Sequence, residues 1–162
     1  MAGAPFRIGY GFDVHQLAEG REFWLGGIKF EHPSGPLGHS DADVLLHAIC
    51  DALLGALALG DIGQHFPDTD ASFKNIDSKI LLKQVIDLVR KNGYEVGNID
   101  ATIILESPKV MKRSLEMRAK IADCMGVTPE QISLKATTSE KMGYIGRKEG
   151  LAAHAVALVY QP

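Results

Sequence analysis

The chain has 162 residues, enough for one domain with its own hydrophobic core, and we expect a single domain over residues 1–162. Hydrophobic residues make up 46% of it and charged residues 23%, as in ordinary soluble globular proteins. The formal net charge of −3 argues against a nucleic-acid-binding protein, because such proteins need a basic surface.

The N-terminus, the apolar runs and the cysteines all bear on location. Residues 1–6 lack the charged and apolar regions of a signal peptide, and the apolar stretch 53–59 is far shorter than the ~20 residues that span a membrane. Cys50 and Cys124 form no Cys-x-x-Cys motif, so neither a disulfide framework nor a cysteine zinc site is predicted. We therefore expect a cytoplasmic protein that does not enter membranes.

The first half of the chain predicts strands followed by a buried helix. Residues 6–15 read as a strand, residues 22–30 as one or two short strands bent at Gly26-Gly27, and residues 33–38 as a connecting loop. Apolar residues at helical spacing predict a buried helix over 44–57, and Ser40 followed by Asp43 resembles a capping box at its start.

The second half alternates helices and strands. Residues 60–76 have no hydrophobic period and predict a functional loop, and residues 78–92 predict a helix that Gly93 stops. The further predicted elements are a strand over 98–106, a helix from Ser107-Pro108 to Gly126, a strand over 132–137, a glycine-rich turn over 143–150 and a strand over 151–160 that is buried on both faces. The residues expected on the buried side of the third helix are Met111, Leu115, Ile121, Ala122 and Met125.

These elements together indicate an α+β fold, a two-layer α/β sandwich. We expect a mixed sheet of four to five strands with helices on one face. No residues remain to cover the other face of the sheet, so we expect a second copy of the chain to bury it in a homo-oligomer.

One pattern of polar residues points to a metal ion. Asp13 and His15 project to the same side of a strand, and His47 lies in the otherwise apolar helix. Two imidazoles and one carboxylate suit zinc and leave a fourth position open, with Asp43 or Asp51 as partners that orient the His47 ring. The alternative is structural: an Asp-x-His strand end without metal, and a core histidine satisfied by a neighbouring aspartate.

Other residues point to phosphate chemistry. The hydroxyls of Thr137-Thr138-Ser139 could cradle phosphate oxygens beside Glu140, which could hold Mg²⁺; the alternative is a solvated strand end. Arg147 could pair with a phosphate or form a surface or interface salt bridge. His39 precedes the central helix and could donate to a phosphoryl oxygen, or it is simply exposed. The Asp68-Thr69-Asp70 cluster either touches a ribose or a metal, or caps turns.

These motifs, in this order, resemble the 2-C-methyl-D-erythritol 2,4-cyclodiphosphate synthase family over nearly the whole chain. The segments that carry the resemblance are Arg7–His15, His39–His47, Gly60–Gly63, Phe66–Asp70, Lys135–Thr138 and Gly146-Arg147. The resemblance implies an enzyme, a phosphorus-oxygen lyase of the non-mevalonate isoprenoid pathway. Such an enzyme converts 4-diphosphocytidyl-2-C-methyl-D-erythritol 2-phosphate to the 2,4-cyclodiphosphate and CMP, without a protein nucleophile.

The resemblance also implies roles for particular residues. Asp13, His15 and His47 would bind one Zn²⁺ per subunit, Glu140 a second divalent cation, Mg²⁺ or Mn²⁺, while His39 and Thr138 would stabilise the transition state. Asp61 and Gly63 would contact the methylerythritol portion beneath a mobile loop, Phe66–Asp70. The full set of implied substrate contacts is Asp13, Val14, His15, His39, Ser40, Asp61, Ile62, Gly63, Phe66, Pro67, Asp68, Thr69, Asp70, Leu105, Glu106, Ser107, Pro108, Lys109, Val110, Met111, Thr137, Thr138, Ser139, Glu140, Tyr144 and Arg147.

The resemblance further implies a homotrimer with active sites between subunits. The segment Leu105–Met111 and Thr137 would form a cytosine pocket for the neighbouring subunit, and Arg147 and Glu149 would lie near an apolar threefold cavity that takes isoprenoid diphosphates. Tyr10 stands where relatives often have histidine, but strand parity relative to Asp13 points it away from the metal ligands. Ser139 replaces a common threonine and keeps the hydroxyl.

Two other functions fit parts of the pattern. A zinc-dependent phosphoesterase would use the open metal position to activate water and would release linear products. A trimeric isoprenoid-diphosphate-binding module would use Arg147 and have no turnover.

Overall fold

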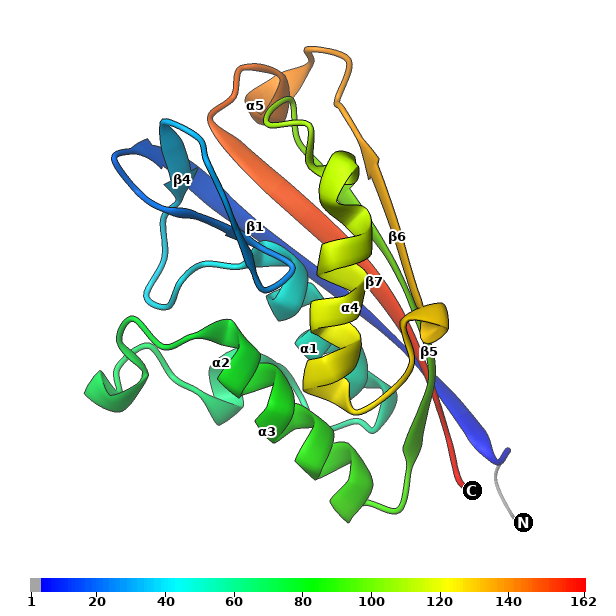
Figure 1. The fold of residues 1–162 in the computed structure, drawn as a ribbon. Coiled ribbons are helices and arrows are strands. Elements are labelled where there is room, and N and C mark those ends of the chain that lie inside the picture. Colours follow the sequence, from blue (N-terminus) through cyan, green and yellow to red (C-terminus); the bar gives the residue numbers. More distant parts are fainter. Residues whose placement is uncertain (1–3) are drawn as a thin grey trace.

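A five-stranded mixed sheet forms one layer of the protein. The computed structural model describes residues 4–162. The prediction that the N-terminus is not a signal peptide therefore falls partly outside the described residues. The strand order is β4-β1-β7-β5-β6, with β5 and β6 parallel and the other neighbours antiparallel (Figure 1). The strands are β1 (Phe6–Glu19), β4 (Ser34–Pro36), β5 (Glu95–Ile104), β6 (Ile132–Thr137) and β7 (Gly150–Tyr160). The predicted α+β class and mixed sheet are confirmed.

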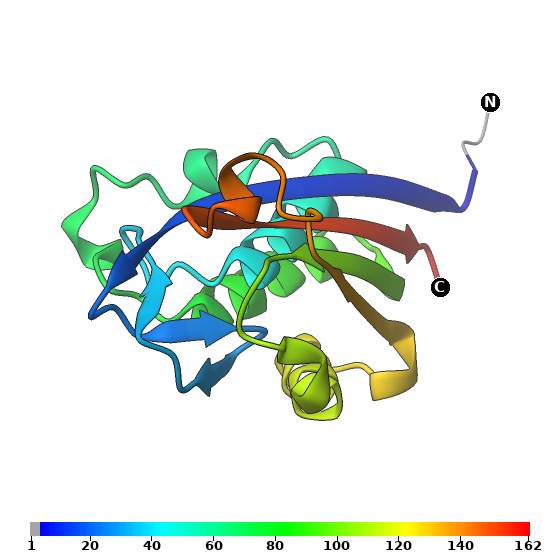
Figure 2. The ribbon, with the colours of Figure 1, turned by 90° about the horizontal axis from the view of Figure 1, so that it is seen from above.

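Helices and a separate hairpin form the rest of the structure. The helices are α1 (Val44–Ala56), α2 (Ile62–His65), α3 (Ser78–Lys91), α4 (Ser114–Met125) and α5 (Gly143–Gly146), with short 3₁₀ turns η1 (Ala71–Phe73), η2 (Val110–Arg113) and η3 (Pro129–Gln131). Helix α1 packs on β1 and β7, α4 packs on β6, and α3 packs against both helices. Figure 2 shows β1 and β7 side by side, with α4 to one side of them. The hairpin of β2 (Phe23–Leu25) and β3 (Ile28–Phe30) turns at Gly26-Gly27, as predicted.

Strand β1 and helix α1 are in backbone contact. A Cβ atom on Gly9 would lie 1.8 Å from the carbonyl oxygen of Ala52, and one on Gly11 would lie 1.9 Å from that of Ala48. Only glycine therefore permits this approach. The contact brings Asp13, in the middle of β1, close to the first half of α1.

The sheet face opposite α1 is apolar and exposed in the single chain. Ile8, Tyr10, Phe12 and Val14 of β1 are each more than 40% exposed. Tyr10 lies on this face, as its strand parity predicted, and its hydroxyl is 2.7 Å from Nδ1 of His154. The prediction that β7 is buried on both faces is wrong for the chain alone, because Val156 is 42% exposed.

The third helix begins later than predicted. Ser107-Pro108 lies before the 3₁₀ turn η2, and α4 begins only at Ser114. A 3₁₀ turn has three residues per turn, so it shifts the phase of the buried stripe. Met111 and Leu115 are consequently exposed, contrary to prediction, whereas the predicted Ile121, Ala122 and Met125 are buried and Gly126 ends the helix.

Several predicted loops contain short regular elements. The 33–38 connection includes β4, which pairs with an extension of β1 to Glu19. The 60–76 loop holds α2 and η1, and the 143–150 turn holds α5. Each element has only three or four residues, too few for a hydrophobic period to reveal it.

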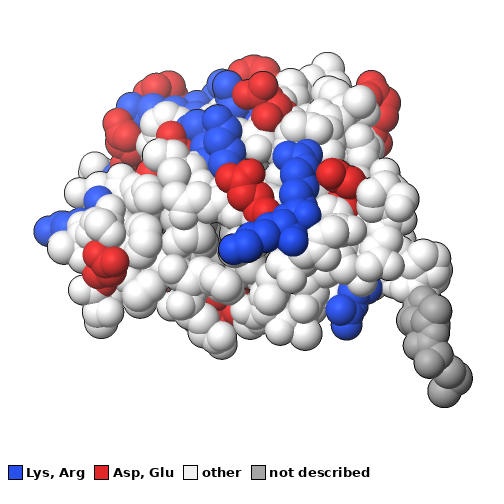
Figure 3. All heavy atoms as spheres, turned by 90° about the horizontal axis from the view of Figure 1, so that it is seen from below, with Lys and Arg blue, Asp and Glu red and all other residues white. Residues whose placement is uncertain are grey.

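The surface carries charges of both signs. On the face drawn in Figure 3, Lys and Arg side chains are interspersed with Asp and Glu. Within residues 4–162, no helix has the length and hydrophobicity required to cross a bilayer.

Candidate metal centre and substrate pocket

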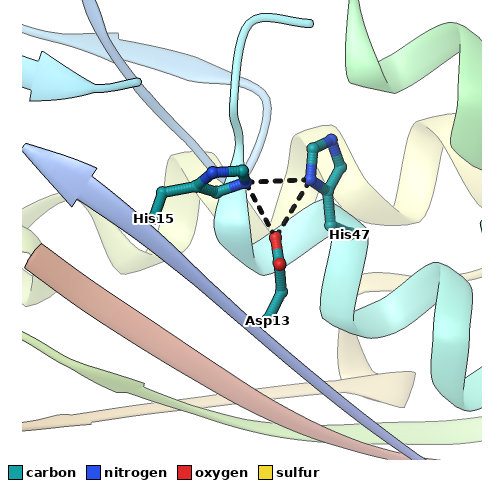
Figure 4. Close-up of side chains that lie close together, drawn as sticks. All are labelled: Asp13, His15 and His47. Atoms are coloured by element: carbon teal, nitrogen blue, oxygen red, sulfur yellow. Dashed lines mark hydrogen bonds and ion pairs between the residues drawn. The ribbon is translucent and has the colours of Figure 1, made fainter. Parts of the chain in front are cut away.

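Asp13, His15 and His47 converge where β1 meets α1 (Figure 4). Oδ2 of Asp13 lies 2.9 Å from Nε2 of His15 and 3.0 Å from Nδ1 of His47, and the two ring nitrogens are 3.2 Å apart. Zinc with bonds of about 2.0–2.1 Å in a tetrahedral arrangement keeps its ligand atoms about 3.4 Å apart. The triangle is therefore close to the size that a metal ion requires.

With both rings neutral, hydrogen bonds satisfy this triangle poorly. Nδ1 of His15 lies 3.1 Å from the carbonyl oxygen of Leu37, which can only accept, so this nitrogen carries the proton of the neutral ring. In this neutral form the Nε2 lone pair of His15 faces the carboxylate oxygen of Asp13 at 2.9 Å, whereas a protonated ring donates a hydrogen bond there. Two electron-rich atoms in such contact favour a bound cation, so the donor set fits a divalent metal.

The other nitrogen of His47 contacts two serine hydroxyls. Its Nε2 lies 2.9 Å from Oγ of Ser78 and 3.2 Å from Oγ of Ser40. Ser78 Oγ in turn donates to Oδ1 of Asp41. Neither Ser78 nor Asp41 was predicted to belong to the site, because no local pattern links position 78 to position 47.

The prediction that Asp43 or Asp51 orients His47 is wrong. Asp43 is the N-cap of α1, and its carboxylate accepts from the backbone N–H groups of Leu46, Gly26 and Gly27. Asp51 accepts from the N–H of Ile62. Both carboxylates turn toward unpaired N–H groups of neighbouring turns instead of the imidazole. The predicted capping box is also wrong, since Asp43 rather than Ser40 caps the helix.

Burial and charge shift the titration of these groups. Burial raises the pKa of Asp13, but the hydrogen bonds from His15 and His47 outweigh it and lower the pKa to about 2. Burial lowers the pKa of His47, but the bond to Asp13 and its charge outweigh it and the pKa lies above its ordinary value. Burial and the charge of Asp41 raise the pKa of Asp43 to about 6. The hydrogen bonds from backbone N–H groups lower this pKa but do not outweigh the two raising effects.

A cavity of about 370 Å³ opens beside the three candidate ligands. Its lining residues are Asp13, His15, Gly38, His39, Ser40, His47, Ile62, Gly63, Phe66, Asp68, Phe73, Ile76 and Leu81. Most were predicted to contact substrate, and His47 was predicted to bind the metal; Gly38, Phe73, Ile76 and Leu81 were not predicted. Nε2 of His39 is buried and has no hydrogen-bond partner among residues 4–162, so it is free for a ligand.

The loop on the rim of this cavity contains two helix caps. Asp61 accepts from the N–H of Gln64 at the start of α2, and Asp70 accepts from the N–H of Ser72 at η1. The capping alternative therefore describes Asp70, while Asp68 lines the cavity. One carboxylate oxygen of Asp61 suffices for its cap.

A second cavity of about 300 Å³ lies beside β6 and η2. Its lining residues are Leu105, Pro108, Lys109, Val110, Met111, Lys112, Ala136, Thr137 and Thr138. The two sets of lining residues, as far as the structure describes the chain, do not overlap. Some of the predicted substrate contacts thus line the first cavity and others line the second, whereas a third group lines neither: Val14, Asp61, Pro67, Thr69, Asp70, Glu106, Ser107, Ser139, Glu140, Tyr144 and Arg147.

The loop after β6 is held by Glu106. Its Oε1 accepts from the N–H groups of Ser139 and Lys141, and Thr138 Oγ1 accepts from the N–H of Glu140. The Glu140 side chain is exposed. Arg147 forms a bidentate surface pair with Glu149 at 2.9 and 3.1 Å, which matches the salt-bridge alternative in the single chain.

Sequence comparisons identify close relatives over nearly the full length. The model of the YgbB family matches residues 6–160. The chain is 61% identical over 153 residues to the 2-C-methyl-D-erythritol 2,4-cyclodiphosphate synthase of Phocaeicola vulgatus, covering 94% of this chain and 96% of that protein. It is 60% identical over 155 residues to the synthase of Porphyromonas gingivalis, covering 96% of each.

Solved structures share the fold. The chain is similar to the bifunctional IspDF from Campylobacter jejuni, with a TM-score of 0.93 and 44% identity over 97% of this chain, and it spans 42% of that protein. It is also similar to IspF of Plasmodium falciparum in its CDP complex, with a TM-score of 0.86, 33% identity and 99% of each chain covered.

Proposed function

This chain belongs to the YgbB family, and we propose which of its residues and metals carry out the cyclisation that it catalyses. The reaction converts 4-diphosphocytidyl-2-C-methyl-D-erythritol 2-phosphate to 2-C-methyl-D-erythritol 2,4-cyclodiphosphate and CMP in the non-mevalonate isoprenoid pathway. An oxygen of the 2-phosphate forms a bond to the β-phosphorus. The bond from that phosphorus to the bridging oxygen breaks, and CMP leaves with the electron pair. The enzyme is a phosphorus-oxygen lyase.

The close triangle of Asp13, His15 and His47 is the observation that carries the proposal. These residues hold one Zn²⁺ per subunit, and the exposed Glu140 holds a second divalent cation, Mg²⁺ or Mn²⁺. When bound, the two metals neutralise the charge of the phosphoryl oxygens. The nitrogen ligands favour zinc at the triangle, whereas a single carboxylate beside substrate phosphates suits Mg²⁺.

His39 and Thr138 stabilise the transition state. His39 lines the cavity of the metal triangle, and its buried Nε2 has no hydrogen-bond partner among residues 4–162, which supports donation to a phosphoryl oxygen whose charge grows. Thr138 lines the other cavity, with the segment Leu105–Met111 that we assign to cytosine. The CDP complex of the Plasmodium falciparum relative supports a nucleotide ligand.

The substrate contacts are those that the family resemblance implied. Asp61, Ile62 and Gly63 contact the methylerythritol portion, and the loop Phe66–Asp70 covers it. Ile62, Gly63, Phe66 and Asp68 already line the first cavity, which supports this assignment.

A homotrimer completes each active site. The two cavities of one chain are separate, so a substrate that needs both can reach His39 of one subunit and Thr138 of its neighbour. The exposed apolar face of β1 provides a surface for assembly, since faces of this kind mark interaction sites. The threefold cavity then takes isoprenoid diphosphates near Arg147. Each chain acts as a single domain over 1–162, in the cytoplasm, whose reducing conditions suit two free cysteines.

Complementation between inactive subunits tests the assignment. His39→Ala and Thr138→Ala are each expected to abolish cyclisation. The assay for these variants is phosphorus NMR of the protein with the substrate, Zn²⁺ and Mg²⁺. Co-expressed, they should regain about a quarter of the wild-type activity, because in random trimers one site in four combines both intact residues.

The matched control pairs His39→Ala with Asp13→Ala. Both changes affect the same cavity, so this mixture should stay inactive. Failure of the first mixture to recover activity would refute a site shared between subunits. Linear phosphate products with oxygen from solvent would indicate a phosphoesterase, and binding without turnover would indicate a binding module.

A further inference from the structure

A hydrogen-bond chain lies behind His47, on the side away from Asp13 and His15. Figure 4 shows the second ring nitrogen of His47, Nε2, directed away from these two residues. It contacts Oγ of Ser78 at 2.9 Å, and this hydroxyl contacts Oδ1 of Asp41. Ser78 is fully buried, and His47 is 6% exposed. The contact between His47 and Ser78 is therefore shielded from water, whereas Asp41 is partly exposed and lines a separate cavity of about 410 Å³.

The chemistry of the three groups sets the direction of the protons. A carboxylate only accepts, so the single hydroxyl proton of Ser78 goes to Asp41. Toward His47 the same oxygen can then only accept, so Nε2 carries the ring proton. Ser40 Oγ, which accepts from the N–H of Ala42, is a second and longer contact at 3.2 Å. In the neutral ring, Nδ1 is left as a lone pair that faces Oδ2 of Asp13 at 3.0 Å.

Backbone contacts hold Asp41 in place. Its Oδ2 accepts from the N–H of Ser78 at 3.0 Å, and its own N–H donates to the carbonyl of Ile76 at 3.2 Å. The N–H of Asn75 donates to the carbonyl of His39 at 2.8 Å. The loop before α1 and the start of α3 are thus tied together beside the His47 ring.

We propose that Asp41 and Ser78 are positioning residues of the metal centre, which keep His47 in the tautomer with the proton on Nε2 so that Nδ1 can bind the metal. This inference rests on the proposed role of Asp13, His15 and His47 as zinc ligands. Groups that orient a metal-binding histidine typically contribute 10- to 100-fold to metal affinity. Neither residue reaches the substrate cavity that His47 lines.

Two substitutions break the chain differently. Ser78→Ala removes the nearer of the two hydroxyls that contact Nε2 and leaves only the longer contact with Ser40. Asp41→Asn retains size but replaces one acceptor oxygen with an NH₂ group; if this group donates to Ser78, the hydroxyl must donate to His47 and the ring proton moves to Nδ1. We expect each variant to bind Zn²⁺ about 10- to 100-fold more weakly than wild type, measured by competition with a chromogenic chelator.

The matched control is Asp77→Asn. Asp77 caps the same end of α3, since its carboxylate accepts from the N–H of Lys79. The Asp77 side chain forms no hydrogen bond with Asp41, Ser78 or His47. The zinc affinity of Asp77→Asn should stay within about twofold of wild type, because His47 Nε2 keeps its contacts with Ser78 and Ser40. Urea unfolding of the metal-free variants separates lost affinity from lost stability.

Nitrogen-15 NMR of the histidine rings provides a spectroscopic test. In wild type bound to Zn²⁺, His47 should show a protonated Nε2 and a metal-bound Nδ1, and this pattern should change in Asp41→Asn. Wild-type zinc affinity and an unchanged ring pattern in both variants would overturn the inference. If Asp13→Ala also bound Zn²⁺ as tightly as wild type, the proposed zinc site itself would be wrong.

Discussion

The backbone contact between β1 and α1 predicts that Gly11→Ala damages the metal centre without altering any ligand. The new Cβ would lie 1.9 Å from the carbonyl oxygen of Ala48, whereas an ordinary carbon–oxygen contact is about 3.3 Å. The strand and helix must therefore separate by about 1.4 Å. Asp13 and His47 lie on opposite sides of this contact.

The displacement exceeds what the metal triangle can absorb. Moving Asp13 by that amount would stretch its 3.0 Å separation from Nδ1 of His47 to about 4.4 Å, beyond the roughly 3.4 Å of a tetrahedral zinc site. We expect zinc affinity to fall by more than about tenfold, or 1.4 kcal/mol. Overpacking should lower the free energy of unfolding by about 1–3 kcal/mol.

Two glycines at the same contact are controls. In Gly9→Ala the Cβ would lie 1.8 Å from the Ala52 oxygen, one turn farther from His47, so stability should fall as much but zinc affinity less. In Gly55→Ala the nearest atom is 3.7 Å away, and alanine inside α1 should stabilise by about 0.5–1 kcal/mol. Urea unfolding without metal and zinc competition measure both quantities. Gly11→Ala with wild-type stability and zinc affinity would refute the reasoning.

Three further predictions concern the carboxylates and the metal. Asp43→Ala should lower the free energy of unfolding by about 3–5 kcal/mol in a urea titration, because α1 loses its cap and two buried N–H groups lose their acceptor; Asp43→Asn, which keeps one acceptor oxygen, should lose less. In the metal-free protein at acidic pH, the protonated rings of His15 and His47 donate hydrogen bonds that outweigh burial and lower the pKa of Asp13 from 3.8 to about 2. This stabilisation is fully present above pH 3.8 and is lost as the pH falls through 2. Asp13→Asn should remove about 2 kcal/mol of this pH dependence of the free energy of unfolding, and an unchanged pH profile would contradict the reasoning. Removal of metal with a chelator should abolish turnover, and added Zn²⁺ should restore it. Asp13→Ala and His47→Ala should stay inactive when Zn²⁺ is added, while light scattering shows an unchanged oligomer size. Loss of the oligomer in these variants would mean that the site is structural.

The sequence by itself determined the fold class and pointed to the three candidate metal ligands. Strand alternation places Asp13 and His15 on one face whatever surrounds them, because side-chain direction depends on the local backbone alone. The isolated histidine in the apolar helix could likewise be recognised from its neighbours. The ordered motifs indicated the family before any distance was known, since several weak patterns in one order are specific together.

Only the tertiary structure decided which groups complete the site. Asp43 and Asp51 were the reasonable partners for His47 by helical spacing, but backbone N–H groups of other segments take both carboxylates. His47 Nε2 instead contacts Ser78, whose hydroxyl donates to Asp41, an interaction between positions 37 residues apart in sequence. The physical reason is that a buried polar group pairs with whatever donor or acceptor packing brings to it, and packing joins segments that no local pattern relates.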